Sequence, residues 1–329
     1  MEFERILITG GCGFIGTSLI AELIKKYPDT RIRILDNLFV GSAQDLSEVC
    51  DFKYARLDEL PTTSPFELVI GDIRDVSTVN TCIKGVDCVI HFAANTGVGP
   101  SVDNPRFDMD CNVFGTFNLL EASRLHGVKK FIFASSGAPA GEVEPPIHEE
   151  LAPHPVSPYG ASKLAGEGYC SAYYRSFNLN TICLRFGNVY GPRSKNKSSL
   201  VAKFIKLALQ REPCIIFGDG SQTRDFLYIS DLVRAVILSI EHEIGGETFQ
   251  IATGGEMTVA DIANLIAREL GKRGINMDIH NHTPRIGDVK RNYSDTSKAK
   301  RILDWSTKID VRDGISLTID WFLKNHVHR

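Results

Sequence analysis

The sequence predicts an α/β fold built on a doubly wound parallel sheet, followed by a smaller α/β lobe. Short apolar runs of strand length alternate with segments of helical periodicity through the first half of the chain, which is typical of parallel sheets. The runs are apolar almost throughout, as expected of strands covered on both faces. A chain of 329 residues also exceeds the usual size of one domain.

Six strands are expected in order, each an apolar run bounded by polar residues or glycine: 5–10, 31–36, 67–72, 88–94, 130–136 and 180–186. The helices expected between or after them have apolar residues three and four apart: 15–27, 76–85, 112–127, 159–178, 199–212 and 259–270. Residues 214–231 read as a strand, a glycine-rich turn and a second strand. We therefore expect a first domain at 1–186 and a second at 187–329, interleaved at the boundary.

The composition excludes several classes of protein. It is 43% hydrophobic and 23% charged with a formal net charge of −3, ordinary values for a globular protein. Without a long basic run, nucleic acid is not an expected partner. No apolar stretch reaches the ~18 residues that a membrane span needs. The charged residues Glu2, Glu4 and Arg5 lead directly into the first strand, unlike a secretory signal.

The eight cysteines are scattered singly, without a CxxC pair or a Cys/His metal spacing. The short histidine pairs at 280–282 and at the end of the chain have no further ligands beside them. We expect reduced, buried thiols in a cytoplasmic protein, and no metal site.

The segment "ITGGCGFIG" follows the first strand and opens the first helix. Its glycines Gly10, Gly13 and Gly16 let the turn close and let the backbone approach a pyrophosphate at the helix N-terminus. Asp36 ends the next strand 20 residues after Gly16, where a carboxylate accepts from the adenosine ribose. Asn37 follows it without an arginine, which favours NAD over NADP, although a basic residue from elsewhere in the fold would weaken that preference.

The segment "SPYGASK" places Tyr159 and Lys163 four residues apart at the start of a helix, so both side chains share one face. An ammonium group near a phenol lowers the pKa of the phenol and suits it to act as a general base. The pair by itself is equally compatible with an ordinary helical contact. Ser135 and Ser136 end the strand that precedes it, and Ser136 is the expected partner of Tyr159.

The glycine turn, the small polar strand end and YxxxK together resemble the extended short-chain dehydrogenase/reductase family. More narrowly, the chain is similar to its nucleotide-sugar epimerases and dehydratases, such as UDP-glucose and UDP-GlcNAc 4-epimerases. Further segments match that family in order: "GDIRD", "HFAA", "NVFGTFNLLEA", "LRFGNVYGPR", "GDGSQTRDFLYISDL" and "RIGDVKRNYSDTSKAKRILDW". The resemblance covers almost the whole chain and implies a Rossmann-type sheet with a C-terminal substrate-binding lobe.

The resemblance also implies which residues hold the cofactor and the substrate. The positions expected to bind NAD are Gly10, Gly13, Phe14, Ile15, Gly16, Asp36, Asn37, Asp72, Ile73, Ala93, Ala94, Asn112, Tyr159 and Lys163. Those expected to bind a UDP-sugar or another nucleoside-diphosphate sugar are Ser135, Ser136, Gly137, Asn188, Phe217, Arg224, Arg285, Asp288 and Asn292. Arg224, Arg285 and Asn188 match positions that bind the diphosphate. Asn292 matches a position that lines the pocket for the 2-substituent, and its size permits an N-acetylhexosamine or a uronic acid.

The reaction is expected to start with Tyr159 removing the O4 proton while the C4 hydride passes to NAD. Relatives that dehydrate or decarboxylate usually carry an acid directly after the strand-end Ser/Thr, where this chain has Gly137 and Ala138. This favours 4-epimerisation. Glu142 lies five residues after Gly137, and a turn that returned it would favour the alternatives, a sugar-nucleotide dehydratase or decarboxylase.

A non-catalytic dinucleotide sensor of the same fold is the alternative from another class, and the intact Ser136, Tyr159 and Lys163 argue against it. Family members often form homodimers through two helices, which here lie near 107–126 and 159–178.

Overall fold

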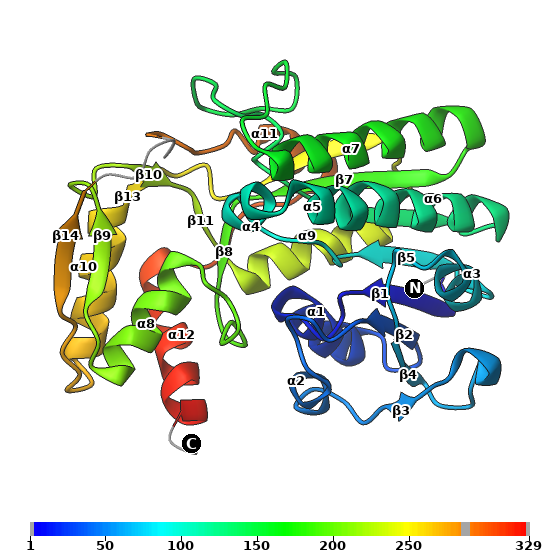
Figure 1. The fold of residues 1–329 in the computed structure, drawn as a ribbon, viewed down its shortest axis with the longest axis horizontal. Coiled ribbons are helices and arrows are strands. Elements are labelled where there is room, and N and C mark those ends of the chain that lie inside the picture. Colours follow the sequence, from blue (N-terminus) through cyan, green and yellow to red (C-terminus); the bar gives the residue numbers. More distant parts are fainter. Residues whose placement is uncertain (1–2, 284–289, 327–329) are drawn as a thin grey trace. The chain divides into compact units, whose positions relative to one another are not determined.

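The computed structural model describes residues 3–283 and 290–326 (Figure 1). The chain separates into two compact units, and each is built from more than one segment. The first contains 1–143, 149–185 and 233–249, and the second contains 144–148, 186–232 and 250–329.

An eight-stranded sheet forms the centre of the first unit. Its strands are β1 (Arg5–Thr9), β2 (Arg31–Asp36), β3 (Lys53–Tyr54), β4 (Phe66–Ile70), β5 (Cys88–His91), β6 (Lys130–Ser136), β7 (Asn180–Phe186) and β12 (Glu247–Ile251). They lie in the order β12-β7-β6-β5-β1-β2-β4-β3, and the pairs among β1 to β6 are parallel. The predicted doubly wound parallel sheet is confirmed. The sequence did not predict β3, because its two exposed residues form no apolar run.

Helices cover both faces of this sheet. The first unit contains α1 (Phe14–Lys26), α2 (Ala43–Ser47), α3 (Val76–Ile83), α4 (Val98–Asp103), α5 (Pro105–Met109), a π-helix (Asp110–Phe114), α6 (Gly115–Leu125), α7 (Pro158–Phe177) and most of α9 (Ile229–Glu241). From β1 to β2 the chain moves one way across the sheet, and from β4 through β5 and β6 to β7 it moves the other way. Because such crossovers are right-handed, α1 lies on one face and α3, α6 and α7 lie on the other.

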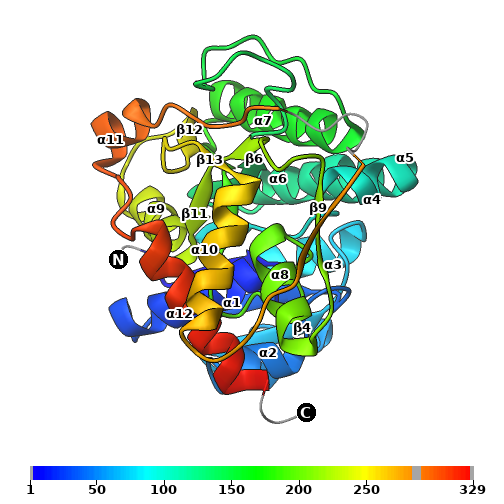
Figure 2. The ribbon, with the colours of Figure 1, turned by 90° about the vertical axis from the view of Figure 1, so that its left-hand side faces the viewer.

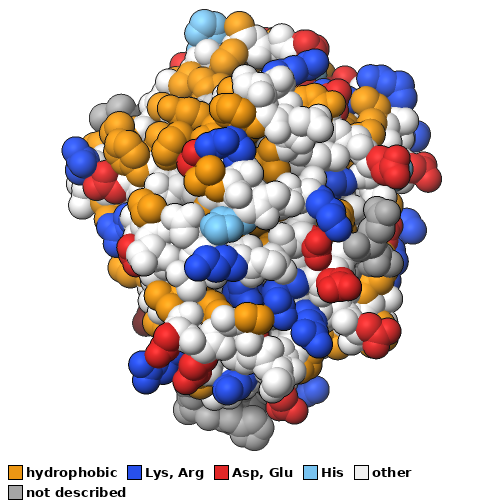
Figure 3. Space-filling model, turned by 90° about the vertical axis from the view of Figure 1, so that its right-hand side faces the viewer, with side chains coloured by type: hydrophobic (Ala, Val, Ile, Leu, Met, Phe, Trp, Pro, Cys, Tyr) orange, Lys and Arg blue, Asp and Glu red, His pale blue; other side chains and the backbone are white. Residues whose placement is uncertain are grey.

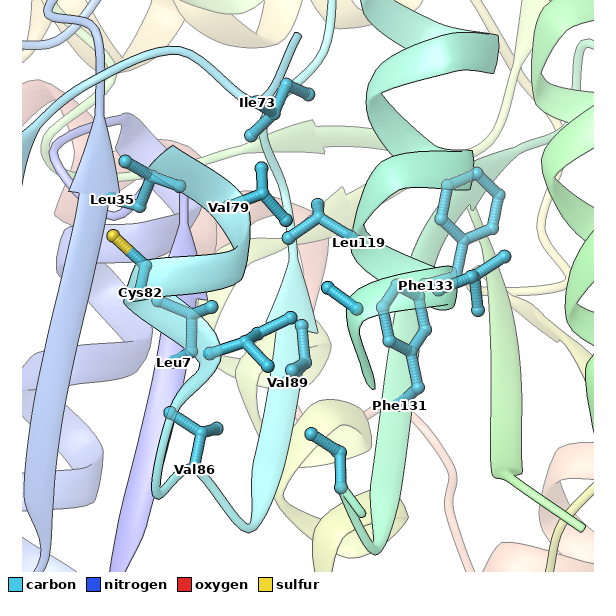
Figure 4. Close-up of a cluster of buried hydrophobic side chains, with 14 of the residues drawn as sticks. Leu7, Leu35, Ile73, Val79, Cys82, Val86, Val89, Leu119, Phe131 and Phe133 are labelled. Atoms are coloured by element: carbon cyan, nitrogen blue, oxygen red, sulfur yellow. The ribbon is translucent and has the colours of Figure 1, made fainter. Parts of the chain in front are cut away.

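The core of the first unit lies between the sheet and these three helices. Alternate strand residues point into it, as strand geometry requires, and they meet side chains of α3, α6 and α7 (Figure 4). The sheet side contains Leu7, Leu35, Val69, Val89, Phe131, Phe133 and Cys183. The helix side contains Val79, Cys82, Ile83, Leu119, Leu120, Ala122, Cys170 and Tyr173. This cluster holds the sheet and the three helices in a fixed relation.

The second unit consists of short strand pairs and longer helices. The parallel pairs are β8 (Asn188–Tyr190) with β11 (Phe226–Tyr228), and β9 (Cys214–Phe217) with β14 (Ile279–His282). The antiparallel pair is β10 (Thr223–Arg224) with β13 (Met257–Thr258). Its helices are α8 (Leu200–Gln210), α10 (Val259–Gly271), α11 (Ser297–Leu303) and α12 (Val311–His326). Figure 2 shows α10 packed beside α8 and α12.

Across the described ranges, no helix is both long enough and apolar enough to cross a membrane.

We expect the core cluster to dominate the stability of the first unit, and α3 offers a matched test. Ile83 is 0% exposed and belongs to the cluster, whereas Val76 on the same helix is 55% exposed. Ile83→Ala should lower the free energy of unfolding by about 2–5 kcal/mol, because it leaves a cavity. Val76→Ala should change it by less than about 0.5 kcal/mol. Denaturant unfolding followed by circular dichroism measures both, and equal effects would contradict the assigned core.

Candidate active site

The glycine turn after β1 has no room for side chains at Gly10 and Gly16. Gly10 has a φ of +68°, and a Cβ there would lie 2.7 Å from the Ala93 nitrogen. A Cβ on Gly16 would lie 2.5 Å from the Gly11 Cα. The N-cap of α1, Gly13, provides no side-chain cap, and the first turn of the helix contains no acid. The partial positive charge of the helix N-terminus is therefore not neutralised by an acidic side chain, which fits a pyrophosphate. Phe14 and Ile15 begin this helix.

Asp36 connects this turn to the end of β2. One carboxylate oxygen accepts from the Cys12 N–H at 2.9 Å and the other accepts from the Leu38 N–H at 2.8 Å. Burial raises the pKa of Asp36, and the two backbone hydrogen bonds oppose that rise. Each oxygen retains acceptor capacity, so the carboxylate is suited to accept from ribose hydroxyls.

The structure brings Asp72 next to Asn37, as a shared adenosine site requires. Asn37 Nδ2 donates to Asp72 at 3.2 Å. Arg74 donates to both Asp72 oxygens at 2.9 and 2.8 Å, and these bonds lower the pKa of Asp72 to about 2. The Arg74 guanidinium also lies 5.1 Å from the ring centre of Phe107, and Phe39, 75% exposed, lies 6.1 Å from the same ring. The sequence did not predict that Arg74, Phe107 and Phe39 lie together beside Asp72, because no regular spacing connects the three.

Ile73 and the residues after β5 complete the surroundings of the turn. Ile73 is buried against Gly115 at the start of α6, where a Cβ would lie 2.5 Å from its side chain. Ala93 and Ala94 follow β5 and are partly exposed. His91 is a core histidine with both ring nitrogens satisfied: they bind the hydroxyls of Thr9 and Thr116 at 2.8 and 3.0 Å. Burial lowers the pKa of His91 well below its usual value, so the ring is neutral.

Tyr159 and Ser136 meet at the end of β6. Ser157 caps α7 by accepting from the Gly160 N–H, and Pro158 occupies the first turn, so Tyr159 is held at the start of the helix. The Tyr159 hydroxyl is hydrogen-bonded to Ser136, whose oxygen also accepts from the Ala138 N–H at 3.2 Å. The bond from the Ala138 N–H holds the Ser136 oxygen against the turn that follows β6.

Lys163 lies one helical turn further and is buried. Its ammonium group donates to the Ala134 carbonyl at 2.9 Å and lies 4.9 Å from the ring centre of Phe133. Burial lowers the pKa of Lys163 to about 8. We expected Lys163 to lower the pKa of Tyr159, but the protein alone does the opposite, because burial raises the pKa of Tyr159. A further positive charge is needed to favour the phenolate, and oxidised nicotinamide carries one.

Ser135 has a different environment from Ser136, because neighbouring strand residues point to opposite faces. Its hydroxyl donates to Glu167 on α7, and Glu167 accepts two hydrogen bonds from Arg185 of β7 at 2.8 and 2.7 Å. All three side chains are buried. Sequence reasoning missed this ion pair, although Glu167 lies four residues after Lys163. Through Glu167, these hydrogen bonds connect α7 to β6 and β7 one helical turn after Lys163.

Of the remaining predicted residues, Asn112 and Gly137 belong to the first unit, and the others belong to the second. Asn188 lies opposite Phe226 in the β8–β11 pair, and Phe226 comes two residues after Arg224. The Arg224 guanidinium donates to the Thr223 carbonyl at 2.7 Å. Phe217 ends β9, where its ring contacts His282. Asn292 is partly exposed, whereas Arg285 and Asp288 lie outside the described residues. Nowhere in residues 3–283 and 290–326 do three or more His, Cys, Asp or Glu side chains gather as a metal site.

Two glycines provide a matched test of the turn. Gly16→Ala places a methyl group 2.5 Å from backbone, and we expect the purified protein to lose most of its bound dinucleotide. Gly168→Ala on α7 meets no atom within 4 Å and should retain it. Dinucleotide released by heat or acid and measured by ultraviolet absorbance quantifies the difference. Equal retention by both variants would contradict the assigned site.

Comparison with known proteins agrees with this geometry. Residues 6–252 match the model of the NAD dependent epimerase/dehydratase family. The chain is 37% identical to a putative UDP-glucose 4-epimerase of Methanocaldococcus jannaschii, covering 98% of this chain and 99% of the relative. It is 34% identical to a UDP-glucuronate 4-epimerase of Thermodesulfobacterium geofontis, covering 97% and 96%.

Solved structures share the whole fold. A UDP-glucose 4-epimerase of Thermotoga maritima with UDP-glucose superimposes with a TM-score of 0.88 at 34% identity, over 98% of this chain and 99% of that one. A dTDP-glucose 4,6-dehydratase of Streptomyces venezuelae with NAD gives 0.87 at 28% identity, over 98% of each chain. The chain therefore belongs to the NAD-dependent epimerase/dehydratase family, and its cofactor is NAD.

Proposed function

We propose that this protein is a UDP-sugar 4-epimerase that retains NAD through the catalytic cycle. One observation carries the proposal: Ser136, Tyr159 and Lys163 are assembled at the end of β6, and the turn that follows carries Gly137 and Ala138 in place of an acid. The first arrangement is suited to move a proton at a sugar hydroxyl. The second lacks the acid that relatives which dehydrate or decarboxylate usually carry there.

In this proposal Tyr159 takes the proton from O4 of the sugar and later returns it. Ser136 shares its hydrogen bond and orients the phenol. Lys163, anchored on the Ala134 carbonyl, supplies positive charge beside the phenolate. When bound, NAD supplies the oxidising power by taking up and returning the hydrogen of C4. If the 4-keto sugar rotates in the site, the hydrogen returns to the opposite face of C4, and the configuration at C4 is inverted.

The turn after β6 separates this proposal from a dehydratase. Hydrogen bonds from Ala140 to the Gly137 carbonyl and from Gly141 to the Ala138 carbonyl close it tightly. Gly141 then packs on His154, where a Cβ would overlap the His154 carbonyl, and Glu142 leaves the turn exposed to solvent. These contacts support a role for Glu142 outside the catalytic group.

We further propose that the first unit binds NAD and the second binds the sugar nucleotide, through Asn188, Arg224, Arg285 and the residues near Phe217 and Asn292. Relatives are named as 4-epimerases of UDP-glucose and of UDP-glucuronate. A UDP-N-acetylglucosamine 4-epimerase of Methanobrevibacter ruminantium is also structurally similar. A UDP-hexose, UDP-N-acetylhexosamine or UDP-glucuronate is therefore the substrate class. The eight free cysteines support a reducing, cytoplasmic environment.

A homodimer formed through α6 and α7 is part of the proposal. The two helices pack together and expose large apolar side chains, Phe117, Leu125, Tyr169 and Phe177, and Phe114 is exposed directly before α6. The rings of Phe117 and Tyr169 meet edge to face across the two helices, with centres 5.6 Å apart. Hydrophobic side chains gather in the upper part of the face in Figure 3, at the height where Figure 1 shows α6 and α7. A second copy of the same face is the partner that a two-fold dimer would provide.

Proton NMR of the protein with UDP-glucose, UDP-GlcNAc and UDP-glucuronate tests the reaction. We expect the C4 epimer of at least one of them without added cofactor. Loss of water or carbon dioxide would support a dehydratase or decarboxylase instead. Bound NAD without turnover of any sugar nucleotide would support a dinucleotide sensor.

Tyr159→Phe should lower kcat by about 10²–10⁴-fold, because it removes the acid/base group. Ser136→Ala should lower it less, since Ser136 assists the transfer without carrying it out. Tyr169→Phe, on the exposed side of the same helix, should retain the wild-type rate. Near wild-type turnover by Tyr159→Phe, with NAD content unchanged, would contradict the assigned base.

Phe117→Glu should convert the dimer into a monomer, because it places a charge in the apolar face. Tyr54→Ser, at an exposed apolar position on β3, is the matched control and should leave the mass unchanged. Light scattering after size exclusion measures both. A wild-type protein of monomeric mass would contradict the proposed dimer.

A further inference from the structure

Asp108 on α5 is a buried carboxylate that is only partly satisfied by hydrogen bonds. It is 1% exposed. Its Oδ1 accepts from Asn95 Nδ2 and from Asn112 Nδ2, each at 3.0 Å. Its Oδ2 is buried and has no hydrogen-bond partner among the residues that the structure describes. A buried carboxylate with an uncommitted oxygen is costly unless a positive charge lies close to it.

The hydrogen bonds of Asn112 connect Asp108 to the catalytic helix. Asn112 Nδ2 also donates to the Ser162 hydroxyl at 3.1 Å, and Ser162 lies directly before Lys163 on α7. Helices α5 and α7 pack against each other. The charge of Asp108 acts on both Tyr159 and Lys163, and it favours the protonated form of each.

Asp108 raises the pKa of Lys163 more than any other neighbouring group does, ahead of Glu167 and Cys170. Glu167 on the same helix is paired with Arg185. His91 on β5 is neutral because burial lowers its pKa, and Cys170 on α7 is a buried thiol. Asp108 has no ion-pair partner among the described residues, and burial alone would disfavour the charge on Lys163.

We propose that Asp108 is a positioning residue that acts through Lys163: its buried negative charge keeps Lys163 an ammonium and so keeps the Tyr159–Lys163 pair in its working charge state. This inference rests on the proposed function, because it assumes that Tyr159 and Lys163 carry out the proton transfer. It adds a second helix, α5, to a catalytic group that otherwise comes from β6 and α7.

The sign of the effect follows from the charge. Removing a negative charge lowers the pKa of Lys163 from about 8 and also lowers the pKa of Tyr159. Tyr159 then ionises at lower pH, which moves the acidic limb of the activity profile down. Lys163 loses its proton at lower pH, which moves the alkaline limb down as well. Both limbs of the bell should therefore move toward acid.

Asp108→Asn tests this, because it keeps the Oδ1 acceptor and the side-chain volume while removing the charge. We expect the kcat/KM profile against pH to shift by about one unit toward acid. The matched control is Asp110→Asn, two residues further, where the carboxylate pairs with the exposed Arg106 at 2.9 Å. It removes the same charge and should leave the profile in place. Asp108→Glu, which restores the charge, should move it back.

A second readout does not need turnover. The near-ultraviolet absorbance of the Tyr159 phenolate is obtained from NAD-loaded protein as the difference between each enzyme and its Tyr159→Phe counterpart. Titrated without sugar, this signal should move toward acid in Asp108→Asn and stay unchanged in Asp110→Asn. If Asp108→Asn fails to fold, the smaller Asp108→Ser carries the same expectation.

The outcomes separate the two proposals. A fall in activity with both the profile and the phenolate titration in place would make Asp108 a packing residue and overturn the inference. Absence of turnover of every sugar nucleotide by the wild-type protein would overturn the proposed function, while the phenolate titration would still decide the role of Asp108.

Discussion

The close packing of α7 on β6 is the constraint on which the candidate active site depends. Gly166 makes it possible, because a Cβ there would lie 2.4 Å from the ring of Phe133. The same approach brings the Lys163 ammonium over that ring and within 2.9 Å of the Ala134 carbonyl. Tyr159, one turn earlier, then reaches Ser136 at the strand end. A looser helix would lose all three contacts together.

This packing is maintained by groups that take no part in the chemistry. The Glu167–Arg185 pair and the hydroxyl of Ser135 join α7 to β6 and β7 one helical turn after Lys163. Breaking a buried ion pair by removing one partner typically costs about 3–5 kcal/mol, because the other charge remains unpaired. The network therefore favours a single position of α7, which preorganises Tyr159 and Lys163 of the candidate active site.

Burial also sets the electrostatics of the site. It raises the pKa of Tyr159 and lowers the pKa of Lys163, so both groups are driven toward their neutral forms. A base near neutral pH needs the opposite for Tyr159, and the positive charge of oxidised nicotinamide provides it when NAD binds. If Tyr159 is the base as proposed, binding of NAD and ionisation of Tyr159 are linked, which fits an enzyme that keeps its NAD.

The sequence by itself determined what local patterns encode. Apolar runs predicted the six strands from β1 to β7 other than β3, the glycine turn predicted the dinucleotide site, and the spacing of Tyr159 and Lys163 predicted their shared helix face. Tertiary structure alone decided which distant groups surround them. Asp108 bonds to Asn112 one helical turn away, but Asn112 reaches Ser162, and Phe107 reaches Arg74, over separations that no periodicity connects. The physical reason is that charge and burial act through space, whereas sequence patterns report only neighbours along the chain.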